Sequence, residues 1–398
     1  MKKRIFIAMH YLEIGGAETS LIGLLHSFDY SKYEVDLFLY SHQGELMSLI
    51  PKEVNLLPEI SAYSYIEKPI VEAAKNGFWG VVFGRLKAKV QAVLLEKRMH
   101  FSKPNNAVYH YIMENIVYCL PKINPSVEYD LAISYLHPFH IVRDKVKAKK
   151  KVGWIHTDFS LFDTDIKSEF PVWNSMDCIV SISEEISKSF LTVFPALAPK
   201  LRTIENILPT AYINHLLEDS SFQSPYIPEA INLLSVGRFS YPKNFDNIPE
   251  ICSMIRSKGL NVYWFLIGYG SDEDLIKQKI AEFAMEEYVI LLGKKVNPYP
   301  YIKACDVYIQ PSRYEGKSVV VREAQYLNKP VIITKFPSSA SQLKDGYDGI
   351  IVPLDNHQCA KGIVDVLNND VLLKKIVANQ QSCDYSNRSE IQKIYDLI

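Results

Sequence analysis

The sequence has few cysteines, and none of them are closely paired. The six stand at positions 119, 178, 252, 305, 359 and 383, and no two form a Cys-x-x-Cys pair. The paired ligands of a zinc ribbon and the framework of a disulfide-rich protein both need closely spaced cysteines, so neither is indicated. Reduced, mostly buried thiols in the cytosol fit this usage best.

The chain also has no large excess of positive or negative charge. The chain has 44 Lys and Arg against 45 Asp and Glu, which gives a formal net charge of -1. A molecule with so little net charge is not a general nucleic-acid binder, and no nucleic-acid partner is expected. The dinucleotide fingerprint Gly-x-Gly-x-x-Gly is absent too, which argues against NAD.

Long apolar runs are lacking as well. No stretch approaches the roughly 18 apolar residues that indicate a membrane-spanning helix. The apolar run near the N-terminus is too short for a signal peptide, and His10 and Glu13 break the apolar pattern directly after it. Residues 4–9 are therefore predicted to form a first buried strand.

What is present is a regular alternation of strand-like and helix-like segments. The chain has 398 residues, 48% of them hydrophobic and 22% charged, which suits two globular domains. Such alternation predicts an α/β protein with mainly parallel sheets covered on both faces. The predicted strands are residues 4–9, 34–40, 131–135, 151–155, 178–182, 202–205, 232–236, 262–267, 289–292, 307–310 and 331–334.

A polar, turn-rich stretch at 218–225 interrupts this alternation and marks a domain boundary. We expect an N-terminal domain over 1–210 and a C-terminal domain over 225–384. Two doubly wound domains would face each other across a cleft, the usual place for a ligand.

Two glutamates in the C-terminal half are the strongest functional signal. Glu315 follows the predicted strand 307–310, and Glu323 lies on a predicted helix over 318–327. The carboxyl end of a parallel strand is where ligands sit, and the N-terminus of the next helix favours phosphate. Carboxylates on both sides of that phosphate could accept hydrogen bonds from the hydroxyls of a sugar and a ribose. A capped surface helix with two solvated glutamates is the alternative.

This segment resembles the glutamate–seven residues–glutamate signature of the retaining GT-B glycosyltransferases, in particular glycosyltransferase family four. The resemblance implies two Rossmann-like domains, with acceptor binding in the first and nucleotide-sugar binding in the second. It also implies that a C-terminal helix at about 385–398 packs back on the first domain. By motif, Glu315 would face the donor sugar and Glu323 the ribose.

The residues Gly237-Arg238, followed by Lys243, resemble a second sequence element of the same family. A leaving diphosphate gains negative charge, and an Arg fork with a Lys ammonium can stabilise it. Arg238 and Lys243 are therefore predicted to be electrostatic catalysts. Two surface cations near a turn are the alternative.

Further site residues follow from the resemblance. His156, at the end of a predicted strand, matches a histidine near the sugar and is counted with Glu315 among the catalytic candidates; a satisfied structural histidine is the alternative. The remaining substrate-binding candidates are loop residues and helix-start residues: Gly15, Gly16, Gly268, Gly293, Val296, Gly316, Lys317, Ser318 and Val319. Lys317 and Ser318 depart from the family pattern, which has a bulky apolar residue and a glycine there, so they bear on sugar identity.

The predicted activity is transfer of a hexose from a nucleotide-diphosphate donor, with UDP-sugar favoured, to an acceptor hydroxyl. The acceptor would be a sugar or a lipid-linked glycan of a bacterial surface polysaccharide or glycoconjugate. No Asp-x-Asp element stands where a metal would be needed, so neither a metal nor a cofactor is predicted. A nucleotide-sugar epimerase on the same fold, or a non-catalytic binding subunit, are the alternatives.

Residues 85–103 combine cations with apolar residues at helical spacing. Arg85, Lys87, Lys89, Lys97, Arg98 and Lys103 stand against one acid, Glu96. Such a basic amphipathic helix can lie on anionic lipid, which would place a cytoplasmic enzyme at the inner face of the cell membrane. A solvated helix that packs its other face on the core is the alternative.

Overall fold

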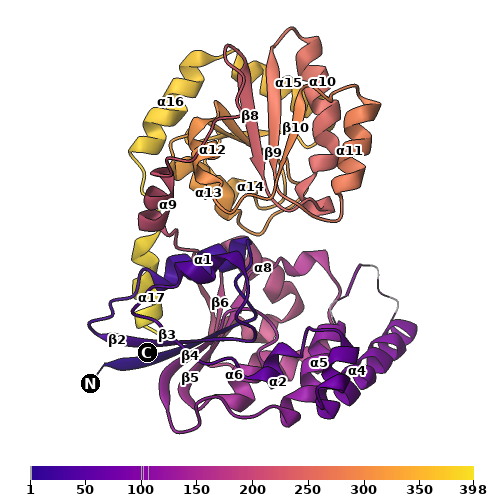
Figure 1. The fold of residues 1–398 in the computed structure, drawn as a ribbon, viewed down its shortest axis with the longest axis vertical. Helices are drawn as coiled ribbons and strands as arrows, with labels where there is room; N and C mark the ends of the chain where they lie inside the picture. The colour runs from indigo at the N-terminus through magenta and orange to yellow at the C-terminus, as the bar shows by residue number, and fades with distance from the viewer. Residues whose placement is uncertain (1, 100, 102, 106) are drawn as a thin grey trace. The chain divides into compact units, whose positions relative to one another are not determined.

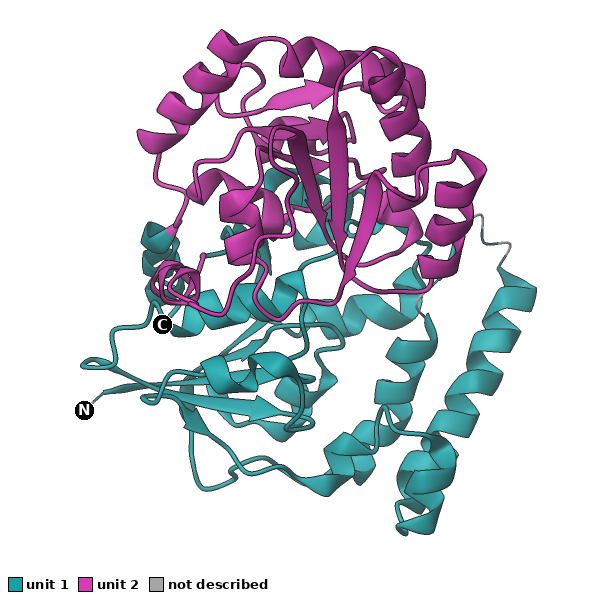
Figure 2. Ribbon diagram, turned by 45° about the horizontal axis from the view of Figure 1, so that its top comes forward, with its two compact units in different colours: residues 1–207, 388–398 teal, residues 208–387 magenta. Residues whose placement is uncertain are grey.

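The computed structural model describes residues 2–99, 101, 103–105 and 107–398. The chain divides into two compact units (Figure 2). Unit 1 comprises residues 1–207 and 388–398, and unit 2 comprises residues 208–387. Within the described residues, no helix combines the length and apolar character that crossing a bilayer requires.

Unit 1 contains a parallel sheet in the order β3-β2-β1-β4-β5-β6-β7 (Figure 1). Helices cover both faces, so the central strands are buried almost throughout. The strands are β1 Lys3–Met9, β2 Tyr33–Leu39, β3 Asn55–Leu56, β4 Tyr129–Ser134, β5 Ala148–Ile155, β6 Cys178–Ser181 and β7 Leu201–Thr203. The helices are α1 Gly16–Leu25, α2 Ser61–Ser64, α3 Ile70–Lys75, α4 Trp79–Arg98, α5 Ala107–Ile116, α6 His140–Lys145, α7 Ile166–Asn174, α8 Glu184–Val193 and α17 Ile391–Tyr395.

Unit 2 contains a parallel sheet in the order β10-β9-β8-β11-β12-β13. The strands are β8 Ile231–Val236, β9 Val262–Ile267, β10 Val289–Gly293, β11 Val307–Gln310, β12 Val331–Thr334 and β13 Ile350–Val352. The helices are α9 Thr210–Leu217, α10 Ile248–Ser257, α11 Glu273–Glu282, α12 Tyr299–Ala304, α13 Val319–Tyr326, α14 Ser339–Gln342, α15 Asn356–Leu367 and α16 Asp370–Gln381.

Neighbouring residues of one strand face opposite layers of unit 2. On β8, Leu233 packs in a core with α10, α11 and α15, whereas Leu234 packs with α9, α12 and α13. Both side chains are fully buried, so this strand is covered on both of its faces. The predicted α/β class with two parallel sheets is confirmed. Two edge strands, β3 and β13, were not among the predicted strands.

In each sheet the strand order reverses at one point, which lies between β1 and β4 in unit 1 and between β8 and β11 in unit 2. Loops leaving the two strands at such a point diverge to opposite faces and leave room for a ligand at the carboxyl ends. The segments from Gly237 to Lys243 and from Pro311 to Ser318 leave β8 and β11, so they flank the reversal point of unit 2.

The end of the chain belongs to unit 1. The ring of Tyr395 on α17 stacks on Tyr33 at a centroid distance of 4.2 Å, and its hydroxyl accepts the backbone N–H of Asp29 at 2.8 Å. Ile394 is fully buried in the same core. The last residues therefore cover the α1 face of the unit 1 sheet.

Candidate functional site

Three strand ends of unit 2 are joined by backbone contacts. The N–H of Gly237 donates to the carbonyl of Ile267 at 2.9 Å, and the N–H of Gly268 donates to the carbonyl of Gly293 at 3.1 Å. A Cβ atom at Gly268 would lie 1.9 Å from the carbonyl oxygen of Gly237. Only glycine permits so close an approach. The structure thus brings together three of the predicted glycines at the carboxyl ends of β8, β9 and β10.

Lys243 and Glu315 form an ion pair across the reversal point. The Lys243 ammonium donates to Oε1 of Glu315 at 2.6 Å, and the Ser312 hydroxyl donates to the same oxygen at 2.7 Å. The Gln310 amide approaches it at 3.3 Å. The two charged side chains are 22% and 9% exposed, so the pair is partly open. Because these donors share Oε1, Oε2 is the oxygen that can accept from a ligand hydroxyl.

Further contacts join the loop after β8 to the loop after β11. Arg313 donates to both carboxylate oxygens of Asp246, at 2.9 and 2.7 Å, and to the carbonyl of Tyr241 at 2.6 Å. Asn244 adopts a left-handed conformation, with φ of 62°, and its amide donates to the carbonyl of Pro311 at 2.8 Å. These contacts fix the position of the Lys243 segment relative to the Glu315 loop.

Glu323 is held on the first turns of α13 and is only 3% exposed. The Tyr299 hydroxyl donates to its Oε1 at 3.0 Å. Burial raises the pKa of Glu323 to about 7, because a charged carboxylate loses hydration there. This carboxyl can therefore become a strong acceptor when a ligand supplies hydroxyl donors.

The start of α13 is partly occupied by a neighbouring side chain. The backbone N–H of Ser318 donates to Oε1 of Gln342 at 2.6 Å, and the Gln342 amide returns a bond to the Ser318 carbonyl at 3.2 Å. The next residues, Val319 to Val321, begin the helix, where the first N–H groups have no acceptor inside the helix. A phosphate at this end would meet the Ser318 hydroxyl and those N–H groups.

The other predicted residues of unit 2 lie at the rim. Arg238 is exposed, and within the described residues its guanidinium forms no hydrogen bond or ion pair. Gly316 and Lys317 are half-buried beside Glu315. Val296 is 52% exposed on the loop after β10, where Gly293 has φ of 71°. Arg238 is therefore the cation of this rim that can turn toward a ligand without losing a partner.

The predicted residues of unit 1 gather at its own reversal point. Gly15 stands at the N-cap of α1, where its carbonyl accepts the N–H of Thr19 at 2.9 Å, and Gly16 is the first helical residue. The ring of His156, just after β5, lies 4.7 Å from that of Tyr135. Burial lowers the pKa of His156 to about 3, so the imidazole is neutral near pH 7. A neutral imidazole can donate or accept a hydrogen bond but adds no charge.

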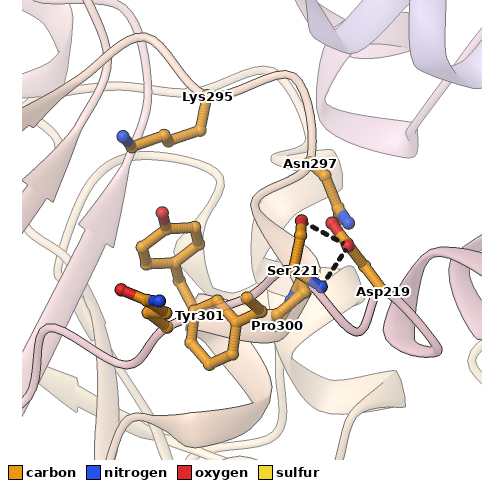
Figure 3. A pocket seen from close by; sticks show the side chains of 8 residues that line it. Asp219, Ser221, Lys295, Asn297, Pro300 and Tyr301 are labelled. Carbon is orange, nitrogen blue, oxygen red and sulfur yellow. Dashed lines mark hydrogen bonds between the residues drawn. The ribbon is translucent and has the colours of Figure 1, made fainter.

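A cavity of about 340 Å³ opens elsewhere on unit 2 (Figure 3). Lys295 and Asn297, from the loop after β10, line it together with Tyr301 and Phe222. Asp219 on its wall accepts two hydrogen bonds from Ser221. None of the predicted site residues lines this cavity, so it is separate from the glutamate site.

Several residues of the glutamate site were missed by sequence reasoning. Gln310 and Ser312 carry a visible signal, because they are polar residues at the end of an apolar strand. Tyr299 and Gln342 carry none, because each lies 24 residues from the partner that it contacts.

Comparison with solved structures defines the class of the fold. The chain aligns with TarM of S. aureus over 99% of both chains, with a TM-score of 0.68 and 16% identity. HepE of Anabaena, solved with UDP and glucose, aligns over 99% of this chain and 98% of that chain, with a TM-score of 0.68 and 15% identity. The protein therefore has the GT-B fold.

Comparison of sequences then gives the family. Residues 218–382 match the family described as Glycosyl transferases group 1. This segment, which holds the glutamate motif, is similar to the group 1 glycosyl transferases. The resemblance stated for the glutamate motif is confirmed.

Three curated relatives match part of the chain. The amylovoran biosynthesis glycosyltransferase AmsD of Erwinia amylovora is 24% identical over 55% of this chain and 61% of its own length. A Campylobacter jejuni N-acetylgalactosaminyltransferase, named for a diphospho-undecaprenol-linked saccharide, is 30% identical over 40% and 41%. The poly(ribitol-phosphate) α-N-acetylglucosaminyltransferase of Staphylococcus aureus is 25% identical over 41% and 34%. The chain thus spans about a third to three fifths of the length of these relatives.

Proposed function

We propose that the protein is a retaining glycosyltransferase that moves a hexose from a UDP-sugar to an acceptor hydroxyl. The observation that carries this proposal is the Lys243–Glu315 ion pair at the carboxyl ends of β8 and β11. It sets an ammonium and a carboxylate side by side where a doubly wound sheet receives its ligand. A diphosphate would bind the Lys243 ammonium, and the sugar hydroxyls would donate hydrogen bonds to the Glu315 carboxylate.

Each charged group has a distinct task in this proposal. Arg238 and Lys243 would stabilise the diphosphate as its bond to the anomeric carbon breaks, and the first N–H groups of α13 would add to that stabilisation. Glu323, which accepts from Tyr299, would accept from the ribose hydroxyls. Glu315 is engaged by Lys243 and Ser312, so it suits holding a sugar better than attacking it.

These roles define which bonds form and break and where the proton goes. The acceptor oxygen would bond to the anomeric carbon on the face that the nucleotide leaves, and the departing phosphate would take the acceptor proton. His156 would meet the sugar or the acceptor as a neutral hydrogen-bonding group. Retention of configuration needs no covalent enzyme intermediate in this scheme.

The relatives guide the choice of donor and acceptor. TarM and HepE were solved with UDP, and the Campylobacter relative is named for a diphospho-undecaprenol-linked acceptor. We infer a UDP-sugar donor and a sugar or lipid-linked glycan acceptor in bacterial surface polysaccharide synthesis. Such an acceptor would be reached from the cytoplasmic face of the membrane.

Calorimetric titration with UDP-, GDP- and ADP-sugars tests the donor. We expect a UDP-sugar to bind and the Glu323→Gln variant to bind it more weakly by about 1.5–3 kcal/mol, the scale of a charged hydrogen bond. Lys277→Ala, which removes an exposed cation from α11, is the matched control and should bind as the wild type does. Failure of every donor to bind the wild-type protein would refute the proposal.

A surface of unit 1 supports a membrane-bound acceptor. Along α4, Gly84, Ala88 and Ala92 are buried, and the opposite side of the helix is apolar and open. The exposed apolar residues are Trp79 (55%), Phe83 (65%), Leu86 (47%), Val90 (58%), Val93 (50%) and Leu94 (60%), followed by Met99 (43%). Their spacing of three and four residues forms one stripe along the helix.

Cations flank this stripe, although fewer than the sequence predicts. Lys87, Lys89, Lys97 and Arg98 are exposed. Arg85 is half-buried and donates to the carbonyls of Tyr65 and Lys68, so it does not face lipid. Positions 100 and 102 of the predicted segment lie outside the described residues.

We expect the stripe to insert among anionic lipids. Cosedimentation with vesicles of phosphatidylglycerol should capture the wild-type protein, whereas the Phe83→Asp/Leu94→Asp variant should remain in the supernatant. Val371→Asp, at a 79% exposed valine of unit 2, is the matched control and should still bind. Equal binding of all three proteins would show that α4 is not the contact.

A further inference from the structure

A cluster of two histidines and a glutamate in unit 1 contains none of the residues assigned to sugar transfer. His110 comes from α5, His137 from the segment after β4, and Glu169 from α7. One ligand atom of each lies within 4.8 Å of the others. Because the three are far apart in sequence, no short motif indicates them. The fold alone brings them together.

Two buried atoms of this cluster have no hydrogen-bond partner in the described part of the chain. These are Nδ1 of His110 and Oε1 of Glu169, and each residue is only 1% exposed. Leaving a buried polar atom unsatisfied costs about 1–3 kcal/mol. Native structures rarely keep such atoms without a water, an ion or another group to satisfy them. The pair therefore points to a ligand.

The surrounding contacts orient these atoms inward. Nε2 of His110 lies 2.7 Å from the Ser168 hydroxyl, and in the tautomer in which Nε2 donates to that hydroxyl, Nδ1 has its lone pair available. The Trp173 indole donates to Oε2 of Glu169 at 3.3 Å, which leaves Oε1 available. The ring of His137 stacks on Trp173 at 5.8 Å. Such outer contacts are typical of metal ligands, whose orientation they fix.

We propose that His110, His137 and Glu169 bind one divalent transition-metal ion, with Zn²⁺ preferred. Two imidazoles and a carboxylate are a donor set that suits Zn²⁺, whereas Ca²⁺ and Mg²⁺ take oxygen ligands.

The ligand atoms are near enough for small side-chain movements to bring them around one ion. Nε2 of His137 lies 3.9 Å from Oε2 of Glu169. At zinc bond lengths, two tetrahedral ligands lie roughly 3.4 Å apart. The ligand atoms, which lie within 4.8 Å of one another, would need to approach by up to about 1.4 Å, and a water would complete the fourth position. His140, fully buried with its ring 5.0 Å from that of His110, closes one side of the cluster.

The expected role of the ion is to tie together α5, α7 and the segment after β4. Cobalt titration of the chelator-treated, full-length protein tests the site, because tetrahedral Co²⁺ absorbs visible light. We expect one equivalent of Co²⁺ to produce these bands, Zn²⁺ to displace it, and Zn²⁺ to raise the melting temperature. Absence of both the bands and the temperature shift in the wild-type protein would overturn the proposal.

Two variants locate the site. Glu169→Gln preserves the shape and an oxygen for Trp173 but removes the anionic ligand, and it should weaken metal binding by on the order of 100-fold or more. His26→Gln replaces an exposed histidine of the same unit and should bind as the wild type does. Near-ultraviolet circular dichroism of the metal-free proteins would show that each is folded. Equal affinity of a folded Glu169→Gln variant would also overturn the proposal.

Donor titration separates this inference from the proposed function. Glu169 lies in unit 1, and the residues assigned to the nucleotide lie in unit 2. We expect Glu169→Gln to retain UDP-sugar affinity within about twofold while losing the metal. Loss of both together would contradict an independent site.

Discussion

At the scale of single residues, the site combines groups whose states differ because their surroundings differ. Glu315 receives an ammonium and a hydroxyl, and it remains partly exposed. Within the described residues, the Glu323 carboxyl accepts from the Tyr299 hydroxyl alone, and it is almost fully buried. The first therefore lies beside a cation, whereas burial raises the pKa of the second to about 7.

Glu323 should make the protein less stable as the pH rises. The folded protein holds this proton up to about pH 7, whereas the unfolded chain releases it near the ordinary value of 4.5. Between these values the folded state binds more protons, so the free energy of unfolding falls with pH. We expect Glu323→Gln to remove a decrease of about 3 kcal/mol between pH 4.5 and pH 7. Urea unfolding of the wild type and the variant at several pH values measures this decrease. If the free energy of unfolding changes equally with pH in both proteins, the raised pKa of Glu323 is excluded.

Arg238 should contribute to the rate more than to folding. Its guanidinium is exposed and forms no ion pair within the described residues, so Arg238→Ala removes little from the folded protein. A donor aimed at developing charge is worth about 3–4 kcal/mol. We therefore expect kcat to fall by roughly 100- to 1000-fold at an unchanged melting temperature. Steady-state kinetics of sugar transfer measures this effect. An unchanged kcat would remove Arg238 from the mechanism.

At the scale of elements, the site depends on how two loops are fastened together. The loops after β8 and β11 flank the reversal point of the unit 2 sheet, and the Arg313–Asp246 pair joins them. Neither side chain is a predicted ligand contact. Their function is to keep Lys243 within reach of Glu315.

A double-mutant cycle measures the energetic coupling between Arg313 and Asp246. We expect Arg313→Ala and Asp246→Ala each to lower the free energy of unfolding, and the double variant to lose less than their sum, with a coupling of about 1–3 kcal/mol. Lys277→Ala with Glu273→Ala, an exposed pair on α11, is the matched control and should couple by about 0.5 kcal/mol or less. Equal couplings for the two pairs would show that Arg313 does not fasten the loops.

The elements also show where sequence reasoning succeeds and where it fails. Strands such as Val262–Ile267 were predicted with their observed bounds, because helices cover both faces and leave an unbroken apolar run. The edge strands β3 and β13 have two and three residues, too few for any periodicity. The contact of Gln342 with the start of α13 could not be predicted, because Gln342 comes from a different helix, α14.

At the scale of the whole molecule, the fold and the family were predictable, whereas the buried polar clusters were not. The glutamate motif and the Gly-Arg element each occupy a short stretch of the sequence, and both lie in unit 2. The cluster of His110, His137 and Glu169 joins three separate elements of unit 1, and Tyr299 reaches Glu323 from another helix. Contacts of this kind depend on tertiary packing, which a single sequence does not display.

The central claim is that positive side chains of unit 2 bind the diphosphate of a nucleotide donor. Calorimetric titration of the wild-type protein and the Lys243→Ala variant with UDP and with uridine tests it most directly, because the two ligands differ only in the diphosphate. We predict that the wild type prefers UDP by about 2 kcal/mol or more, and that Lys243→Ala loses most of this preference while its uridine affinity is unchanged. An equal preference for UDP in both proteins would contradict the account.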